Sequence, residues 1–232
     1  MNVKELFSLD QQCAIVVGGA GKIGTPMVEA LAEAGANVVI ASKNAEKTLS
    51  EGLDHYHDRG LSVSNINMDQ SSEESVTNAL QKITAKHGSP SILINSGYVR
   101  PMMDFYDDTV ENWDSSMVIN SRGLFITCRI FGNAMAKNGT GSIINISSIY
   151  GVVAPDMAVY DGVDFETEPD YPFVKGGTIA YTKYLASYYA QKGVRVNCII
   201  PGGMFNSQPE PFLTNFKNKT LQNRMAKFDD MK

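Results

Sequence analysis

The chain has 232 residues, of which 43% are hydrophobic and 19% are charged, and its formal net charge is -5. This length and composition suit one globular domain with a large core, and they exclude a disordered chain. The acidic balance and the lack of a long Lys/Arg run argue against nucleic acid or an anionic membrane as the main partner, and favour a small molecule.

Targeting segments, membrane spans and metal sites are not expected. The N-terminal stretch MNVKELFSLDQQ has no long apolar region, and no stretch elsewhere could span a bilayer, so we expect a cytoplasmic protein. The cysteines Cys13, Cys128 and Cys198 lie far apart in apolar surroundings, which favours buried reduced thiols over disulfides or metal ligands. His55 and His57 are interpreted as part of an exposed polar helix, so no metal is predicted.

Short runs rich in β-branched residues alternate with amphipathic segments along the chain. The runs predict strands over residues 13–17, 37–41, 61–68, 91–95, 141–147 and 194–200. Helical spacing of apolar residues predicts helices around Ile23, Met27, Leu31 and Ala34, around Val76, Leu80 and Ile83, and around Met117, Leu124 and Ile130. Strands without a polar face, separated by helices, indicate a parallel sheet covered on both faces. We therefore expect an α/β fold, a doubly wound parallel sheet (Rossmann fold) in three α/β/α layers, with ligands beyond the carboxyl ends of the strands.

A glycine-rich turn, GGAGKIG at residues 18–24, follows the first predicted strand and leads into the first predicted helix. Glycine is needed where the backbone has positive φ or where a phosphate approaches the amides of a helix N-terminus. The order strand, glycines, helix therefore favours a nucleotide-binding turn over a tight turn with only a structural role.

The end of the second predicted strand bears on the choice of cofactor. NAD-binding folds of this kind place an acid there for the ribose hydroxyls, whereas a 2′-phosphate requires a cation. This chain has Ala41, Ser42 and Lys43 at that point. We therefore expect a preference for NADP(H), with NAD(H) as the alternative.

From about Gln11 onward, the chain resembles the short-chain dehydrogenase/reductase family. The glycine turn is similar to the family's cofactor turn, with Val17 and Lys22 where single-domain members usually have Thr and Gly. Its glycine spacing instead fits the extended, sugar-nucleotide-modifying members. Five later motifs follow in the order of the single-domain members: INSG (94–97), VINSRG (118–123), NISS (145–148), YPFVK (171–175) and VRVNCIIPGG (194–203). Extended members also need a sizeable C-terminal substrate domain, which the residues after Pro201 are too few to form, so the single-domain subclass is expected.

The resemblance implies a cofactor site built from the glycine turn, the strand ends and the loops that follow them. The implied cofactor-binding residues are Gly18, Gly21, Lys22, Ile23, Gly24, Ser42, Lys43, Asp69, Asn95, Ser96, Gly97, Tyr171, Lys175, Pro201 and Gly202. Asp69 matches the family position that contacts the adenine.

Tyr171 and Lys175 lie four residues apart at the start of a predicted helix, so they share one helical face. An ammonium beside a phenol stabilises the phenolate, so Lys175 is predicted to lower the pKa of Tyr171 below its free value of about 10. The resemblance implies that Tyr171 donates a proton to the substrate carbonyl oxygen while a nicotinamide hydride attacks the carbon. It also implies that Ser148 hydrogen-bonds this oxygen, that Lys175 binds the nicotinamide ribose, and that Asn120 holds a water linking Lys175 to solvent.

Ser148 and Tyr171 are 23 residues apart, which is wider than in most members of the family. The intervening segment, about residues 150–170, has no basic residue and carries Asp156, Asp161, Asp164, Glu166, Glu168 and Asp170. We expect a loop over the active site. It is either a solvated surface insertion or a source of carboxylates that accept hydrogen bonds from a hydroxyl-rich substrate.

These observations predict one dinucleotide-binding and catalytic domain over residues 1–232. The family continues with a further helix and a final strand, so the chain either is naturally short or lacks its end here. The expected function is interconversion of a carbonyl and a secondary alcohol, on a sugar or polyol, by a homo-oligomer. Two alternatives stay open: a 3-oxoacyl-thioester reductase, against which the acidic insertion argues, and a non-catalytic nucleotide-binding regulator, against which the intact set of Asn120, Ser148, Tyr171 and Lys175 argues.

Overall fold

A single parallel sheet forms the centre of the protein in the computed structural model, which describes residues 2–44 and 52–232. The order of its strands is β3-β2-β1-β4-β5-β6. They are β1 (Cys13–Val17), β2 (Asn37–Ser42), β3 (Val63–Asn67), β4 (Ile92–Asn95), β5 (Gly141–Ile146) and β6 (Val194–Ile199). Each strand lies on its predicted run, with ends that differ by no more than two residues.

The central strand β1 shows why these runs form a covered sheet. Every residue of β1 is buried, and the strand pairs in parallel with β2 and β4. Val16 lies between Ile40 on one side and Ile94 on the other. A strand with apolar side chains on both faces is stable only where helices cover both faces.

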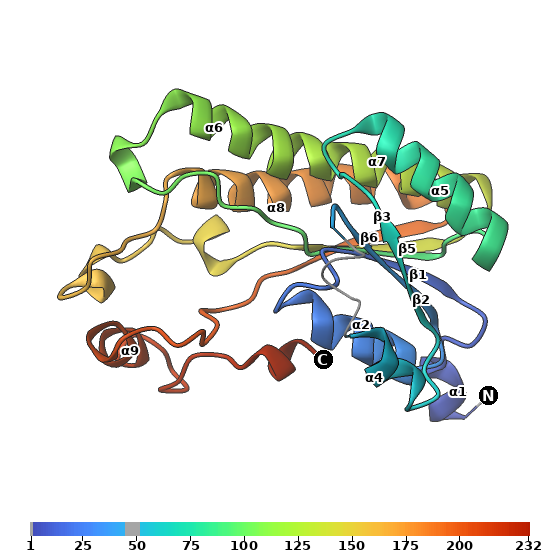
Figure 1. The fold of residues 1–232 in the computed structure, drawn as a ribbon, viewed down its shortest axis with the longest axis horizontal. Helices are drawn as coiled ribbons and strands as arrows, with labels where there is room; N and C mark the ends of the chain where they lie inside the picture. Colours follow the sequence, from blue (N-terminus) through green and yellow to red (C-terminus); the bar gives the residue numbers. More distant parts are fainter. Residues whose placement is uncertain (1, 45–51) are drawn as a thin grey trace.

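Helices cover the two faces of the sheet in separate layers (Figure 1). One layer holds α5 (Glu73–His87), α7 (Gly123–Lys137) and α8 (Asp170–Tyr189), and the other holds α2 (Gly24–Glu33) and α4 (Leu53–His57). Shorter helices are α1 (Val3–Phe7), α6 (Val110–Ser116) and α9 (Glu210–Lys217). The remaining helical turns are η1 (Phe105–Asp107), the π-helical η2 (Met117–Arg122), η3 (Ile149–Gly151), η4 (Met157–Tyr160), η5 (Ala190–Lys192) and η6 (Phe228–Met231). The predicted doubly wound fold is confirmed.

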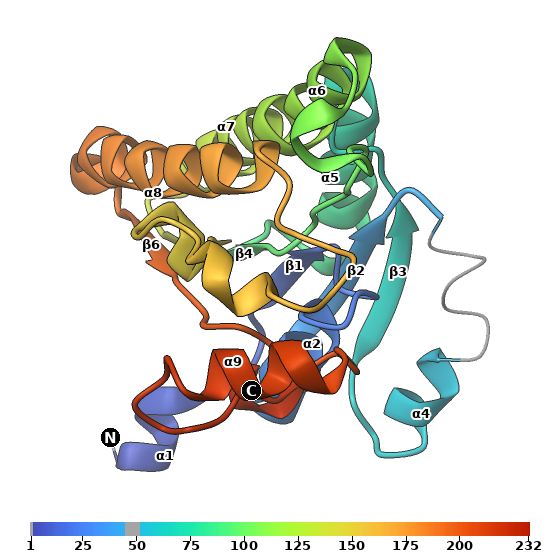
Figure 2. The ribbon, with the colours of Figure 1, turned by 90° about the vertical axis from the view of Figure 1, so that its left-hand side faces the viewer.

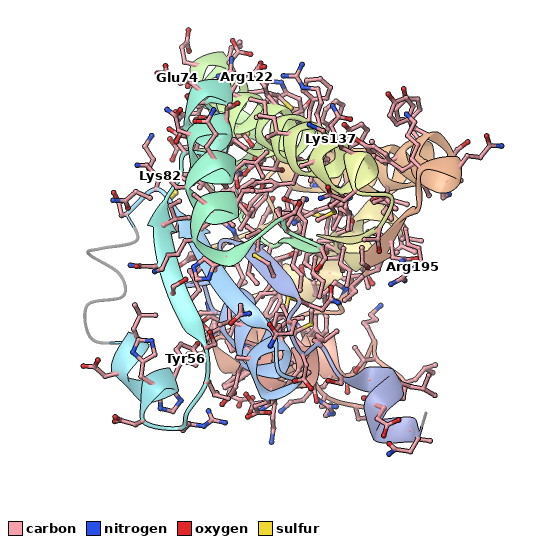
Figure 3. The ribbon with its side chains drawn as sticks, turned by 90° about the vertical axis from the view of Figure 1, so that its right-hand side faces the viewer. Tyr56, Glu74, Lys82, Arg122, Lys137 and Arg195 are labelled. Carbon is pink, nitrogen blue, oxygen red and sulfur yellow. The ribbon has the colours of Figure 1, made fainter. Side chains whose placement is uncertain are left out.

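Each face of the sheet has its own hydrophobic core. Phe131 and Leu185 belong to the core under α7 and α8, and Val28 and Tyr56 belong to the core under α2 and α4. Polar side chains lie on the outer surface of α5 and at the end of α7: Figure 3 labels Glu74, Lys82 and Lys137, all exposed. This division of polar and apolar faces is what the helical periodicity of the sequence predicts.

The helix α8 has a well-defined start, which matters because it carries the YPFVK motif. Pro169 directly precedes the helix, and Pro172 lies in its first turn. Proline is tolerated there because the first amides of a helix have no partner within the helix.

The acidic insertion and the C-terminal segment pack against each other. A third apolar cluster consists of Val159, Tyr160, Phe212, Leu213, Phe216 and Met225. Figure 2 shows the segment after β5 (yellow) between α8 and α9. This cluster holds η4 and α9 together at the side of the molecule where the strands end.

Two predictions about simple features can be compared with the fold. Cys13 and Cys128 are buried and Cys198 is half-buried, and none of the three forms a disulfide. His55 and His57 are exposed on α4, and the described residues contain no group of three or more His, Cys, Asp or Glu placed to hold a metal. Across residues 2–44 and 52–232, no helix has the length and apolar character needed to cross a membrane.

Candidate active site

A cleft of about 630 Å³ lies at the carboxyl ends of the strands. The glycine turn, the end of β5, the loop after β6, the start of α8, the acidic insertion and the C-terminal segment all contribute to its lining. The position is the one expected for a ligand in a doubly wound fold.

The glycine turn is built so that its backbone lies close to other backbone. Gly18 has a φ of 73°, and a Cβ added there would lie 2.5 Å from the Cα of Gly97. A Cβ on Gly24 would lie 2.3 Å from the carbonyl oxygen of Gly18. Only glycine fits these positions, and the result is that the N-terminus of α2 opens onto the cleft. The bare amides at that end suit the pyrophosphate of a dinucleotide.

Most of the predicted cofactor residues near this turn line the cleft. They are Gly18, Gly21, Lys22, Ile23, Gly24, Ser96, Tyr171, Lys175 and Gly202. The side chain of Lys22 hydrogen-bonds Asn206, which brings the C-terminal segment to the turn. The carbonyl of Pro201 accepts from the amide of Ile149 at 3.1 Å, so Pro201 joins the loops after β6 and β5.

The polar residues at the end of β2 form a second part of the predicted cofactor site. Lys43 pairs with Asp69 at 2.8 Å, so the charge of the predicted phosphate-binding lysine is already compensated. The hydroxyl of Ser42 is buried and has no hydrogen-bond partner among the described residues. A buried hydroxyl without a partner is a group that a ligand hydroxyl or phosphate can satisfy. The residues present therefore fit a dinucleotide.

Asn95 has a role that the sequence did not indicate. Its side-chain amide donates to the Asn145 side chain at 2.8 Å and accepts from the Thr127 hydroxyl at 2.9 Å. All three residues are buried. This network joins β4, β5 and α7 below the cleft, so the side chain of Asn95 supports the floor of the site and does not line the large cleft.

Ser148, Tyr171 and Lys175 meet at the end of β5 and the start of α8. The Ser147 hydroxyl donates to the carbonyl of Lys175 at 2.7 Å, which ties the helix to the strand end. The Ser148 hydroxyl lies close enough to the Tyr171 phenol to favour its ionised form, and both side chains line the cleft. The spacing of 23 residues between them in the sequence therefore does not separate them in space.

The environment of Tyr171 differs from the prediction. Burial raises the pKa of its phenol above the usual value, and the nearby Ser148 hydroxyl and the charge of Arg100 offset this only in part. The predicted pKa below the usual value is therefore wrong for this structure. Burial of the phenol is the largest effect, and the ammonium of Lys175 hydrogen-bonds to a carbonyl and lies 5.6 Å from the centroid of the Tyr171 ring.

Lys175 is a buried ammonium held by a carbonyl and an aromatic ring. It donates to the carbonyl of Ile146 at 3.0 Å, and it lies 4.8 Å from the centroid of the Tyr98 ring. Burial, with a smaller contribution from the nearby charge of Arg100, lowers the pKa of Lys175 to about 8. The charge of this lysine therefore changes close to physiological pH.

Asn120 lies in the π-helical turn η2, a local widening of the helix that is frequent at functional sites. Its side-chain amide donates to the Val99 carbonyl at 2.8 Å, and its side-chain oxygen accepts from the Val99 amide at 3.0 Å. A cavity of about 20 Å³ lies beside Asn120, Tyr98 and Lys175. This is room for one water molecule. The predicted water held by Asn120 stays a prediction.

The acidic insertion reaches the cleft through only part of its length. Glu166 and Glu168 line the cleft, and Glu168 is paired with Arg100 at 3.7 Å. Asp156 instead pairs with Lys219 at 2.8 Å and fixes the insertion to the C-terminal segment. The part of the insertion that directly precedes α8 therefore lines the cleft, whereas Asp156 does not.

Aromatic residues and one arginine complete the site, and the sequence reasoning did not identify them. Tyr98 meets the Tyr171 ring edge-on, with centroids 5.2 Å apart, and Arg100 lies 5.8 Å from the centroid of that ring. The hydroxyls of Tyr150 and Tyr160 are hydrogen-bonded at 3.2 Å. The position of Tyr98 directly after INSG was the available signal, whereas Arg100 had none.

The chain is similar to known oxidoreductases over most of its length. The short chain dehydrogenase family model matches residues 12–209. The D-threitol dehydrogenase of Mycolicibacterium smegmatis is 32% identical over 195 residues, which are 84% of this chain and 71% of that enzyme. The 3-oxoacyl-(acyl-carrier-protein) reductase of Chlamydia muridarum is 30% identical over 214 residues, which are 92% of this chain and 82% of that enzyme. A solved short chain dehydrogenase from Leptospira borgpetersenii with bound NAD+ is 28% identical and has a TM-score of 0.86, and the match covers 100% of this chain and 85% of that one.

Proposed function

Because the chain belongs to the short-chain dehydrogenase family, we propose that it is an NADP(H)-preferring enzyme that interconverts a carbonyl and a secondary alcohol on a sugar- or polyol-like substrate. The observation that carries this proposal is that Ser148 and Tyr171 lie close together and share one cleft with Lys175 and the glycine turn. We also propose that residues 1–232 form one catalytic domain, with the insertion at about residues 150–170.

In carbonyl reduction, Tyr171 donates its phenolic proton to the substrate oxygen, and Ser148 donates a hydrogen bond to the same oxygen. A nicotinamide cofactor held by the glycine turn and Lys175 would supply the hydride in reduction and accept it in oxidation. The raised pKa of Tyr171 keeps the phenol protonated at neutral pH, which suits a proton donor. Lys175 stabilises the phenolate left after proton transfer and binds the ribose. A positioned acid of this kind contributes about 10²–10⁴-fold to the rate.

The preference for NADP(H) rests on the end of β2. No acid stands there, and the Ser42 hydroxyl is buried without a partner among the described residues. The pairing of Lys43 with Asp69 competes with a phosphate, and the Leptospira structure holds NAD+, so NAD(H) is the alternative.

A hydroxyl-rich substrate is supported by the polar groups beside Tyr171. Glu166, Glu168 and the hydroxyls of Tyr150 and Tyr160 line the cleft, and Arg100 is compensated by Glu168. These groups can accept hydrogen bonds from several substrate hydroxyls and donate hydrogen bonds to them. They present no net positive charge that would attract an acidic carrier protein. The similar D-threitol dehydrogenase is named for a polyol, which agrees with a hydroxyl-rich substrate.

A second candidate is reduction of 3-oxoacyl thioesters, because the Chlamydia reductase is nearly as similar as the threitol enzyme. The test is a screen of NADPH oxidation over ketoses, keto-acids and acyl thioesters, with Tyr171→Phe as the control. We expect turnover with ketoses and none above the control with thioesters. Turnover with thioesters alone would make 3-oxoacyl-thioester reduction the leading candidate. No turnover with any carbonyl compound would favour the non-catalytic regulator.

We also propose that the enzyme is a homo-oligomer that associates through α7 and α8. Phe125 and Tyr184 are exposed on these helices, by 45% and 62%. Tyr184 stacks between Tyr181 and Tyr188, with centroids 6.2 Å and 6.1 Å away. An exposed aromatic surface of this kind favours contact with a second copy. Sedimentation velocity tests this, and a monomer at micromolar concentration would contradict it.

A further inference from the structure

Asp170, directly before Tyr171, is a buried carboxylate that the proposed reaction does not use. Asp170 is only 1% exposed to solvent. One carboxylate oxygen accepts from the Tyr98 hydroxyl at 3.0 Å and from the Ser116 hydroxyl. The other oxygen is buried and has no hydrogen-bond partner among residues 2–44 and 52–232.

An ordinary structural role does not account for these contacts. Acids are common in the first turn of a helix, where they stay near solvent and interact with the helix amides. The carboxylate of Asp170 instead bonds to side chains that lie 72 and 54 residues away in the sequence. Burying a carboxylate is costly, and an amide or hydroxyl would cap the helix at a lower cost.

The partners of Asp170 contact the proposed catalytic groups. Ser116 accepts a hydrogen bond from the side-chain amide of Asn120 at 3.0 Å. Tyr98 meets the Tyr171 ring edge-on at 5.2 Å, and its ring face lies 4.8 Å from the ammonium of Lys175. One carboxylate thus holds two side chains that between them contact three of the four proposed catalytic residues.

Tyr98 and Asn120 are also two walls of the cavity of about 20 Å³ beside Lys175. The hydrogen bond from Tyr98 to Asp170 fixes where its ring lies, and therefore fixes the size of this cavity. A displacement of Tyr98 would both open the cavity and remove the aromatic face from the ammonium.

We propose that Asp170 is a positioning residue of the active site, which holds Tyr98 against Lys175 and Tyr171, and Ser116 against Asn120. The inference rests on the proposed function, because it assigns Asp170 to the same reaction. Asp170 does not touch the substrate. It acts through the hydroxyls of Tyr98 and Ser116, from which it accepts hydrogen bonds.

The test compares Asp170→Asn with Tyr98→Phe and Ser116→Ala, each of which removes one donor. We expect Asp170→Asn to lower kcat by up to about 100-fold, the size of effect that a displacement of about 1 Å can have. The dissociation constant of the cofactor should stay within a few-fold of the wild type. Asp58→Asn, an exposed acid at the end of α4, is the matched control and should leave kcat unchanged.

The pH profile separates positioning from a merely structural role. The aromatic face of Tyr98 favours the charged form of Lys175. Its displacement in Asp170→Asn should therefore move the alkaline fall of kcat/KM to lower pH, and Tyr98→Phe should move it in the same direction. The titratable and charged groups near this cluster are Tyr98, Arg100, Tyr150, Glu168, Asp170, Tyr171, Lys175 and Cys198. The Asp170→Asn/Tyr98→Phe double variant should lose less than the sum of the two single losses, since both act on one contact.

A folded Asp170→Asn enzyme with unchanged kcat and an unchanged alkaline limb would overturn the inference. If Asp170→Asn does not fold, then Tyr98→Phe and Ser116→Ala decide, and wild-type kcat in both would overturn it. In either case Tyr171→Phe is assayed in parallel: an inactive Tyr171→Phe beside a fully active Asp170→Asn removes only this inference, whereas an active Tyr171→Phe removes the proposed function.

Discussion

The ammonium of Lys175 donates to the carbonyl oxygen of Ile146 at 3.0 Å, and so joins α8 to the end of β5. Ile146 stands two residues before Ser148 in the chain. The same bond therefore fixes the strand end that carries Ser148 relative to the helix that carries Tyr171. The sheet and α8 are both well packed, so the three side chains are placed by rigid elements.

The first prediction concerns the proton donor. Tyr171→Phe keeps the ring and its packing but has no proton to donate, so we expect kcat to fall by about 10²–10⁴-fold. Isothermal titration should show nearly unchanged cofactor binding. Tyr106→Phe is the matched control because Tyr106 is 87% exposed, and it should be fully active. A Tyr171→Phe enzyme within a few-fold of the wild type would sink the proposed mechanism.

The second prediction is a loss of carbonyl reduction at alkaline pH. The folded-state pKa of Lys175 is lowered to about 8, so the lysine is charged below this pH and neutral above it. The raised pKa of Tyr171 keeps the phenol protonated over the same range. We therefore expect kcat/KM for reduction to be constant at neutral pH and to fall above about 8, because the phenolate loses its cation.

Lys175→Arg provides the control for this assignment, because guanidinium keeps its charge at all accessible pH values. Its activity should be lower at neutral pH, since the geometry changes, but its alkaline fall should disappear or move upward. An alkaline limb that is the same in both enzymes would assign the titration to another group.

The third prediction concerns the choice of cofactor. Lys43→Glu places a carboxylate beside Asp69 and beside the expected 2′-phosphate, so NADPH binding should weaken much more than NADH binding. The ratio of the two dissociation constants, measured by fluorescence titration, is the readout. Lys82→Glu makes the same charge change on the outer surface of α5 and should leave the ratio unchanged (Figure 3). A ratio that Lys43→Glu does not alter would remove Lys43 from the cofactor site.

The fourth prediction concerns the substrate. Glu168→Gln removes the charge that compensates Arg100 and weakens an acceptor beside Tyr171. For a sugar or polyol substrate we expect a higher KM, while the dissociation constant of the cofactor stays nearly constant. Asp164→Asn, an exposed acid of the same insertion outside the cleft lining, should have little effect. Equal KM values in Glu168→Gln and the wild type would return the insertion to a surface role.

Much of the fold followed from the sequence because its signals are local. Each strand is a short apolar run, and each catalytic motif stands at a strand end or a helix start, where a parallel sheet brings it to one edge. The spacing of Tyr171 and Lys175 predicted that they share a helical face, and the family resemblance implied that Ser148 acts beside them. The prediction of a loop over the site rested in the same way on the length of the insertion.

The features that the sequence did not indicate depend on distant contacts. The rise in the pKa of Tyr171 comes from its burial, and the partners of Asp170 lie on other elements of the fold. The carboxylate of Asp170 was grouped with the other acids of the insertion, although it begins α8 and is buried. Composition alone cannot separate a buried acid from its exposed neighbours.

The outer wall of the cleft can be substituted independently of the cores that pack against the sheet. Tyr160 and Phe212 both line the cleft and belong to the apolar cluster between η4 and α9, which shares no residue with the two cores of the sheet. Substitutions in this cluster alter the shape offered to a substrate but leave the packing of the strands untouched. Libraries that randomise this wall should therefore yield many folded variants with new selectivity, and directed evolution of the enzyme should begin there.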